Sequence, residues 1–276
     1  MEICVTLNGD INTTKGEIAM TQLDDIQIKE VVRERYGELA RNSASGSDCC
    51  ATDCCSDGET DLDTILPLYA SGQTDGLPAE ALAASAGCGN PHAIGTLQTG
   101  ETVVDFGSGG GIDCFIAAKA VGEQGRVVGI DMTEDMVDLA RSNAASLGLD
   151  NVEFHLSEME STPLEDGSVD AIISNCVINL APDKDLVFGE AYRILRPGGR
   201  LMVSDLVKID EIPEEEAEDT ANWVSCLAGT EMKDVYLGRM EAAGFTDVQI
   251  VSSAPWREEG WRSNIHSMNI SAIKPV

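Results

Sequence analysis

Positive charge and long apolar runs are both scarce in this sequence of 276 residues. Lysine and arginine together number 18, against 48 aspartates and glutamates, which gives a formal net charge of −30. Such a field repels phosphate backbones and anionic lipid surfaces, so we expect neither nucleic acid nor membrane partners. No apolar run approaches the roughly 18 residues that a membrane-spanning helix needs. The carboxylate excess fits either a protein of a high-salt cytoplasm or an acidic protein of a cytoplasm with ordinary salt.

A secretion signal and a secreted disulfide framework are also missing. No basic segment followed by an apolar stretch comes after Met1 and Glu2, so we expect no signal peptide and a cytoplasmic location. The nine cysteines are an odd number, which argues against a framework of disulfides. In a reducing compartment most of them are free thiols, available to soft metals or to redox chemistry.

The first sixty residues predict little packed structure beyond one helix, over 24–40. The following segment, 42–60, is rich in Ser, Asp, Gly and Cys and has almost nothing to bury, so we expect it to move freely unless something binds it. It carries two pairs of adjacent cysteines, Cys49 with Cys50 and Cys54 with Cys55.

From residue 102 the sequence alternates short apolar runs with helical patterns, which predicts an α/β fold with a parallel sheet and crossover helices. The expected strands are 102–106, 126–131, 152–156, 169–174 and 200–206. Helices are expected over 113–121, 184–195, 214–228 and 233–243, and one that Thr133 caps and Gly148 ends. Two late strands, 247–252 and 268–273, have no helical pattern between them and predict an antiparallel hairpin at the sheet edge.

A glycine loop follows the first strand of this sheet. Asp105 and Phe106 lead into Gly107-Ser108-Gly109-Gly110-Gly111, and a helix comes next. Glycines let the backbone approach a ligand closely, and the start of a helix offers free N–H groups, although a glycine loop can also be a plain turn. The dinucleotide fingerprint requires a third glycine where Ile112 stands, so the spacing here is Gly-x-Gly-x-Gly instead.

Acidic and methionine side chains end the next two strands. Asp131 can accept hydrogen bonds from both hydroxyls of a ribose, and Met132 can lie against an adenine. Glu158 and Met159 follow the third strand, near the expected adenine edge, and Asn175 follows the fourth strand at the same side of the sheet.

Together these residues resemble the class I methyltransferases, whose first motif is an acidic residue followed by Gly-x-Gly-x-Gly. The resemblance covers 102–206 and implies a Rossmann-like, seven-stranded sheet with one antiparallel strand. It also implies S-adenosylmethionine as cofactor. The residues that it assigns to the cofactor are Asp105, Gly107, Ser108, Gly109, Gly111, Asp131, Met132, Glu158, Met159 and Asn175.

Three separated cysteines could also meet near the methyl donor. Cys176 follows the fourth strand directly, where the ends of parallel strands border a ligand crevice, although a buried structural cysteine would fit too. Cys88 lies between two glycines, and Cys226 follows the fifth strand in the chain. A structural zinc site is an alternative, but it usually shows Cys-x-x-Cys or Cys/His pairs, whereas the near pairs here are Cys-Cys-x-x-x-Cys-Cys and the three histidines are scattered. Cys4 and Cys114 have no evident role, and Cys114 is expected in the core.

A closer resemblance is to the arsenite methyltransferases. The residues that support this resemblance are Gly87-Cys88-Gly89-Asn90-Pro91, the glycine loop, the segment Ser174–Lys184 with its run Asn-Cys-Val-Ile-Asn-Leu, the isolated Cys226, and Tyr36–Ala40, which leads into the paired cysteines. It implies that Cys88, Cys176 and Cys226 bind As(III) as thiolates, with Cys49 or Cys50 in thiol–disulfide steps.

The same resemblance implies partners and a domain division. The substrate is arsenite or its thiol conjugates, and an external thiol reductant of the thioredoxin or glutathione type restores the thiols. We expect a monomer with an N-terminal helix and Cys-rich arm over 1–66 and a methyltransferase domain over 67–276. The sequence ends soon after the sheet, and we expect it to lack the extra C-terminal domain of longer members.

Two other functions fit parts of the sequence. A carbon- or oxygen-methylating enzyme for a small organic substrate would place Cys176 in the core and a base near the methyl group. A thiol-rich protein that binds soft metals without chemistry would explain the cysteines but would leave the glycine loop and Asp131 without a role.

Overall fold

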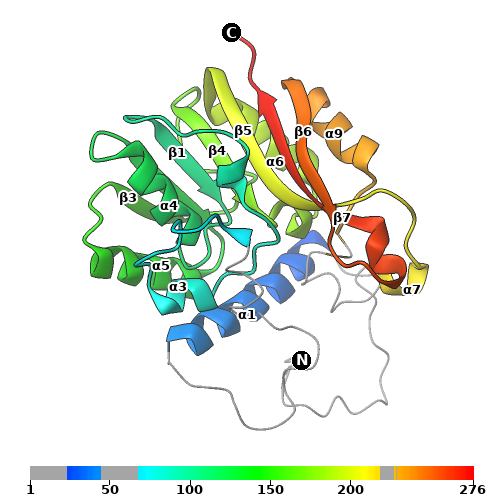
Figure 1. Ribbon diagram of the computed structural model, residues 1–276, viewed down its shortest axis with the longest axis horizontal. Helices are drawn as coiled ribbons and strands as arrows, with labels where there is room; N and C mark the ends of the chain where they lie inside the picture. The colour runs from blue at the N-terminus through cyan, green and yellow to red at the C-terminus, as the bar shows by residue number, and fades with distance from the viewer. Residues whose placement is uncertain (1–23, 45–67, 218–226, 228) are drawn as a thin grey trace.

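One mixed sheet with helices on both faces forms the body of the molecule (Figure 1). The computed structural model describes residues 24–44, 68–217, 227 and 229–276. The seven strands lie in the order β3-β2-β1-β4-β5-β7-β6. They are β1 (Thr102–Phe106), β2 (Arg126–Asp131), β3 (Val152–Leu156), β4 (Val169–Asn175), β5 (Leu195–Lys208), β6 (Thr246–Pro255) and β7 (Ile265–Ile273).

Strand β7 alone runs against its neighbours in this sheet. Strands β1 to β5 pair in parallel, and β7 pairs antiparallel with both β5 and β6. The predicted seven-stranded sheet with one antiparallel strand is therefore confirmed. The two late strands are paired as predicted, but β7 lies inside the sheet and β6 forms the edge.

The described helices cover both faces of the sheet and one end of it (Figure 1). The α-helices are α1 (Asp25–Ala44), α3 (Ala79–Ala83), α4 (Ile112–Val121), α5 (Glu134–Leu147), α6 (Lys184–Ile194), α7 (Glu214–Ala217) and α9 (Lys233–Ala242). Short 3-10 turns are η3 (Pro91–Ala93), η4 (Ile178–Leu180) and η5 (Gly260–Asn264). The helix expected over 214–228 is described only at its start, because residues 218–226 and 228 lie outside the described part.

The central strands are apolar on both sides because helices cover both sides. Val103 and Val104 of β1 are fully buried but belong to different hydrophobic clusters. Val103 packs in a cluster with Phe115 of α4, and Val104 in one with Phe188 of α6. Successive side chains of a strand point to opposite faces, so a strand between two helix layers must be apolar throughout.

Several predicted boundaries are confirmed, and others differ: α1 runs on to Ala44, and β6 and β7 are longer than predicted. Strands β1, β2 and β3 have the predicted limits, and Gly148 ends α5 in the left-handed conformation. Thr133 stands at the start of α5, but its side chain makes no capping hydrogen bond. Its backbone N–H donates to the Asp131 side chain at 2.9 Å, and this contact holds the residue that precedes α5. Strand β5 begins at Leu195 rather than Arg200, because Leu195 already pairs with Val169.

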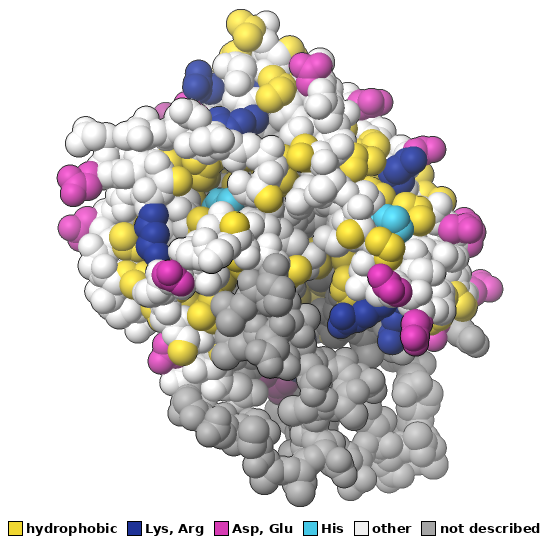
Figure 2. Space-filling model, viewed as in Figure 1, with side chains coloured by type: hydrophobic (Ala, Val, Ile, Leu, Met, Phe, Trp, Pro, Cys, Tyr) yellow, Lys and Arg dark blue, Asp and Glu magenta, His cyan; other side chains and the backbone are white. Residues whose placement is uncertain are grey.

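The surface of the molecule is strongly acidic, as the net charge requires. Figure 2 shows aspartate and glutamate side chains around the outline of one face, with hydrophobic side chains over its middle. No helix among the described residues is both long and apolar enough to cross a membrane.

Candidate functional site

The glycine loop after β1 forms one wall of a pocket at the carboxyl ends of the parallel strands. Gly107 has a φ of +69°, and a Cβ there would lie 2.4 Å from a Val177 methyl carbon. Gly111 has a φ of +95°, and its Cβ would lie 2.5 Å from the Phe115 ring. Both positions therefore exclude a side chain, and the loop can keep its backbone against a ligand.

Asp131 at the end of β2 holds this loop in place. One of its carboxylate oxygens accepts from the Gly109 N–H at 2.9 Å, and the other accepts from the Thr133 N–H at 2.9 Å. Burial raises the pKa of Asp131, and these backbone donors act in the opposite direction. The carboxylate lines the pocket beside Met132 and keeps lone pairs for further donors such as ribose hydroxyls.

Most of the residues predicted to bind a cofactor do line this pocket. They are Gly107, Ser108, Gly109, Asp131, Met132, Met159 and Asn175. Asp105 and Gly111, which were also predicted to bind the cofactor, do not line the pocket. The Asp105 side chain is buried and accepts from the Cys114 thiol at 3.3 Å, and burial, then Asp113, raises its pKa well above the usual range. Cys114 is buried in the core, as predicted.

Glu158 lies beside the pocket and binds protein cations. Its two carboxylate oxygens accept from Lys29 Nζ and Arg33 Nη2, both at 2.6 Å. Glu160 pairs with Lys29 at 2.8 Å as well. The Lys29 contact, ahead of the opposing effect of partial burial, lowers the pKa of Glu158.

These ion pairs anchor α1 over the pocket, which the sequence did not reveal. Lys29, Val32 and Tyr36 from one face of α1 are part of the pocket lining. A further pair joins Arg41 at the end of α1 to Asp135 of α5. The sequence predicted the helix, but charged residues at these positions are just as typical of a solvated face. The helix assigned to a separate N-terminal arm thus closes one side of the pocket.

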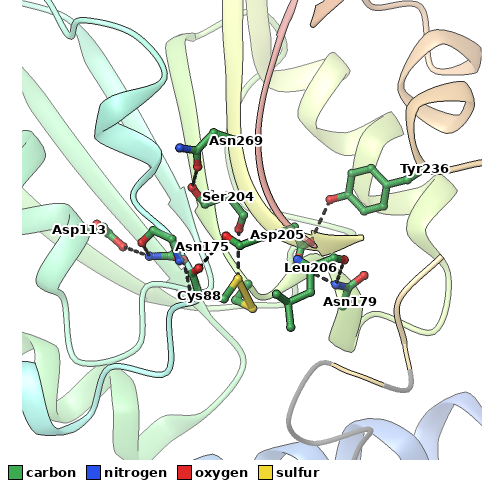
Figure 3. Close-up of a disulfide and its surroundings, with 12 residues drawn as sticks. Cys88, Asp113, Asn175, Asn179, Ser204, Asp205, Leu206, Tyr236 and Asn269 are labelled. Atoms are coloured by element: carbon green, nitrogen blue, oxygen red, sulfur yellow. Dashed lines mark hydrogen bonds between the residues drawn. A yellow bond between two sulfur atoms is a disulfide. The ribbon is translucent and has the colours of Figure 1, made fainter. Parts of the chain in front are cut away.

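The two predicted arsenic-binding cysteines of the described region meet at the rim of this pocket. Cys88 and Cys176 are joined as a disulfide, with Cα atoms 5.7 Å apart (Figure 3). Cys176 lines the pocket directly after β4 and has a φ of +62°, a left-handed conformation that is uncommon for a residue with a side chain. Its backbone N–H donates to the Ser204 carbonyl of β5 at 2.8 Å. The other cysteines assigned to the thiol chemistry, Cys49, Cys50 and Cys226, lie outside the described residues.

A buried carboxylate stands next to the two sulfurs. Asp205 of β5 is fully buried, and one of its oxygens lies within 4.8 Å of the sulfurs of both Cys88 and Cys176. It accepts from Asn179 Nδ2 at 2.8 Å and from the Tyr236 hydroxyl at 2.9 Å (Figure 3). Burial raises the pKa of Asp205 to about 7, against the effect of these donors. Nothing in the local sequence marks Asp205 as different from other strand residues.

A second buried network joins the cysteines to the pocket. Asp113 lines the pocket at the start of α4 and accepts from the Tyr69 hydroxyl at 3.1 Å and from Asn175 Nδ2 at 3.1 Å. The His92 ring nitrogen Nε2 lies 3.1 Å from the same carboxylate. Burial, with Asp113 next, raises the pKa of Tyr69 well above its usual range. Tyr69, His92 and Asp113 come from three separate segments, so sequence spacing could not group them.

Comparison with known proteins agrees with this geometry. The family model of the methyltransferase domain matches residues 97–246. The arsenite methyltransferase of Halobacterium salinarum is 41% identical over 244 residues, which is 85% of this chain and 61% of that protein. The arsenite methyltransferase of Aquipseudomonas alcaligenes is 36% identical over 233 residues, which is 82% of this chain and 64% of that protein. The chain therefore spans about six tenths of the length of these curated relatives.

A solved structure supports the same grouping. The arsenic(III) S-adenosylmethionine methyltransferase of Chlamydomonas reinhardtii superposes with a TM-score of 0.61 at 31% identity, covering 78% of this chain and 73% of that one. The family model matches more than half of the chain, and this relative is matched over most of its length. The chain belongs to the methyltransferase-domain family and, within it, to the arsenite methyltransferases.

Proposed function

We propose that this protein transfers methyl groups from S-adenosylmethionine to trivalent arsenic held by cysteine thiolates. The observation that carries the proposal is the meeting of Cys88 and Cys176, 88 residues apart in sequence, at the rim of the pocket that the glycine loop forms. Two cysteines whose Cα atoms lie 5.7 Å apart can bind one soft atom between their sulfurs, and thiolates are the ligands that soft atoms prefer. By resemblance to the family, Cys226 supplies the third thiolate.

The pocket residues suit S-adenosylmethionine. Asp131 offers its carboxylate to the ribose hydroxyls, and Met132 and Met159 offer apolar contact to the adenine. The buried hydroxyl of Ser108 has no hydrogen-bond partner among the described residues, which leaves it free for a ligand group. The side-chain-free backbone at Gly107 gives the methionine part of the cofactor room. When bound, the cofactor supplies an electrophilic methyl group on a sulfonium.

The chemistry at the thiols then needs positioning more than a general base. Arsenic(III) bound by thiolates keeps a lone pair, and the residues 88 and 176 hold it at the rim of the cofactor pocket. Cys88 and Cys176 would hold arsenic with its lone pair toward the methyl group that the cofactor supplies, and transfer of that methyl would leave S-adenosylhomocysteine and oxidise arsenic by two electrons. Two thiolates return two electrons to arsenic by forming a disulfide. An external thiol reductant of the thioredoxin or glutathione type then reduces that disulfide.

The physiological setting and the chain organisation belong to the same proposal. Reversible thiol chemistry fits a reducing cytoplasm, and a monomer suffices for the site as described. We keep the division into an arm over 1–66 and a methyltransferase domain over 67–276, with α1 as the part of the arm that closes the pocket. Cys49 or Cys50 is proposed to pass reducing equivalents to the site.

Arsenite-dependent formation of S-adenosylhomocysteine by the purified full chain tests the proposal. The protein is reduced with glutathione and thioredoxin, and the arsenical products are separated by chromatography. We expect product only when arsenite, cofactor and reductant are all present. A methyltransferase for an organic substrate would be indifferent to arsenite, and a metal-binding protein would consume no cofactor, so either result would refute the proposal.

A further inference from the structure

The side-chain amide of Asn175 lies between the Cys88 turn and the pocket, and both of its edges are used (Figure 3). Its oxygen accepts from the Cys88 N–H at 3.2 Å and from the Gly89 N–H at 3.3 Å. Its nitrogen donates to the Gly89 carbonyl at 3.0 Å and to Asp113 Oδ2 at 3.1 Å. One side chain therefore ties the backbone on which Cys88 sits to the end of β4, where Cys176 is the next residue.

The Cys88 turn is shaped to receive this amide. A Cβ at Gly87 would lie 2.5 Å from Asn175 Nδ2, so a side chain at that position would push the amide away. A Cβ at Gly89 would lie 2.9 Å from the Ser204 Cβ. On the opposite side, the Ser267 hydroxyl of β7 donates to the Cys88 carbonyl at 2.8 Å. The backbone groups of the turn are thus bonded to β4 and β7, and the turn packs closely against β5 between them.

Cys176 is fixed from the same place by different means. The Cys176 N–H donates to the Ser204 carbonyl, and the left-handed backbone at this residue directs the chain out of β4. Ser204 also lies against Gly89. Both cysteine segments therefore lie against Ser204 of β5, and the Asn175 amide bonds the Cys88 turn to the end of β4.

We propose that Asn175 is a positioning residue whose amide holds the Cys88 turn against β4, so that the two thiols are preset as a chelating pair. This inference rests on the proposed arsenic site for its purpose, and it differs from the expectation that Asn175 binds the cofactor. An amide fits the role because the turn presents two donors and one acceptor, and the adjacent Asp113 carboxylate accepts a further hydrogen bond. A carboxylate or a hydroxyl could not satisfy all four groups.

The test measures how strongly the two thiols favour each other, without arsenic. The full-length protein is equilibrated with mixtures of reduced and oxidised glutathione, in which two protein thiols become a disulfide as one glutathione disulfide becomes two glutathiones. Differential alkylation and peptide mass spectrometry then report the state of Cys88 and Cys176. We expect N175A to lower the equilibrium constant for this disulfide by tenfold or more, because a loosened turn lowers the effective concentration of one thiol near the other.

Asn90 offers a matched control on the same turn. It is also a buried amide, but it accepts from the His92 N–H at 3.0 Å and donates to Gln73 Oε1 at 2.9 Å rather than contacting the cysteines. We expect N90A to change the equilibrium constant by less than threefold. An equal loss in both variants would mean that general loosening causes the effect, and it would overturn the role assigned to Asn175.

A second variant keeps the size of the side chain. N175D retains the acceptor for the Cys88 and Gly89 N–H groups but loses the donor and faces Asp113 across 3.1 Å. We expect it to lower the equilibrium constant too, and N175D/D113N to recover part of the loss, because an amide then donates across the same contact. Absence of recovery counts against the network.

The cofactor affinity separates this role from the earlier one. Titration calorimetry with S-adenosylhomocysteine is run on the same variants. If N175A kept the wild-type thiol–disulfide equilibrium constant but bound S-adenosylhomocysteine tenfold more weakly, Asn175 would be a cofactor ligand and the proposal would be overturned. Failure of the wild-type protein to methylate arsenite would count against the proposed function, whereas the arsenic-free equilibrium would still test Asn175 by itself.

Discussion

Cys88 and Cys176 are 88 residues apart in the chain, yet their Cα atoms lie 5.7 Å apart and their sulfurs are joined. Cys88 comes from a turn before the sheet, and Cys176 from the end of its fourth strand. The contact exists because the turn is bonded to Asn175 and Ser267, which belong to strands on either side of β5. The thiol pair and the pocket therefore both form at the carboxyl ends of the parallel strands.

Replacing Cys176 is expected to remove the proposed arsenite methylation while leaving the pocket for the cofactor intact. We expect Cys176→Ser to reduce arsenite methylation to background, since a hydroxyl is a poor ligand for a soft atom. Cofactor affinity, measured by calorimetry, stays within about threefold of wild type by our estimate, because Asp131 and the glycine loop are untouched. Cys114→Ser is the matched control, since Cys114 is buried outside the pocket lining. Wild-type turnover in the Cys176 variant would remove the thiol model.

Asp131 is expected to carry much of the cofactor affinity. Asp131→Ala removes the acceptor for ribose hydroxyls and frees the Gly109 N–H from its partner. A hydrogen bond to a charged group is worth about 1.5–3 kcal/mol, so the dissociation constant rises roughly tenfold or more. Calorimetric titration with S-adenosylhomocysteine measures it, with Asp138→Ala of the exposed face of α5 as control. An unchanged dissociation constant would reject this role.

Glu158 is expected to hold α1 in place over the pocket. Glu158→Gln keeps the shape of the side chain but weakens the contacts to Lys29 and Arg33. Partly exposed ion pairs are worth about 0.2–1 kcal/mol each, so weakening both pairs speeds up hydrogen exchange in α1 by at most roughly two- to thirtyfold. Added salt is expected to reduce the difference in exchange rate between the variant and the wild type, because salt screens exposed ion pairs.

The control for α1 is Glu153→Gln, which weakens the contacts to Arg126 and His155 instead. It is expected to leave exchange in α1 unchanged. If Glu158→Gln weakened cofactor binding tenfold while hydrogen exchange in α1 stayed at the wild-type rate, Glu158 would be a cofactor ligand and not an anchor of α1.

Asp205 makes the folded state sensitive to pH. Its pKa is raised from 3.8 to about 7 by burial, so between these values the folded chain keeps a proton that the unfolded chain has lost. The free energy of unfolding therefore falls as pH rises through this window and flattens above it. One pKa unit corresponds to about 1.4 kcal/mol, so the loss between pH 5 and pH 8 approaches about 3 kcal/mol.

The Asp205→Asn variant isolates this contribution. Its amide can still accept from Asn179 and contact Tyr236, but it does not titrate. Urea unfolding of both proteins at pH 5 and pH 8, under reducing conditions, is expected to show a smaller loss of stability in the variant by a few kcal/mol. Equal losses in the two proteins would contradict the raised pKa.

Periodicity predicted the sheet well because each of its signals is local. The apolar runs of β1 and β2, and the left-handed glycine after α5, are read from a few adjacent residues. The glycine loop in the pocket lining was predictable for the same reason, since Gly107 follows β1 and Asp131 ends β2, and both strands end on the same side of the sheet. The position of β7 inside the sheet was not, because a hairpin pattern does not say which of its strands pairs with β5.

The other parts of the site depend on contacts between distant segments. Whether Lys29 faces solvent or Glu158 is decided by how α1 packs, and a pattern of charges does not show this. Asp205 is distinguished from other strand residues by its burial and by its hydrogen bond from Tyr236, and both depend on the fold. Asn175 was assigned to the cofactor from its position after β4, and its contacts with the Cys88 turn emerge only when residues 88 and 175 are brought together.

X-ray absorption at the arsenic edge of the reduced protein, loaded with one equivalent of arsenite, reports how many sulfurs bind the arsenic atom. We predict an arsenic atom bound by three sulfurs in the wild type, and by fewer sulfurs in Cys88→Ser and in Cys176→Ser. An unchanged sulfur coordination in both variants would show that arsenic binds elsewhere, and it would contradict the assignment of Cys88 and Cys176 to arsenic.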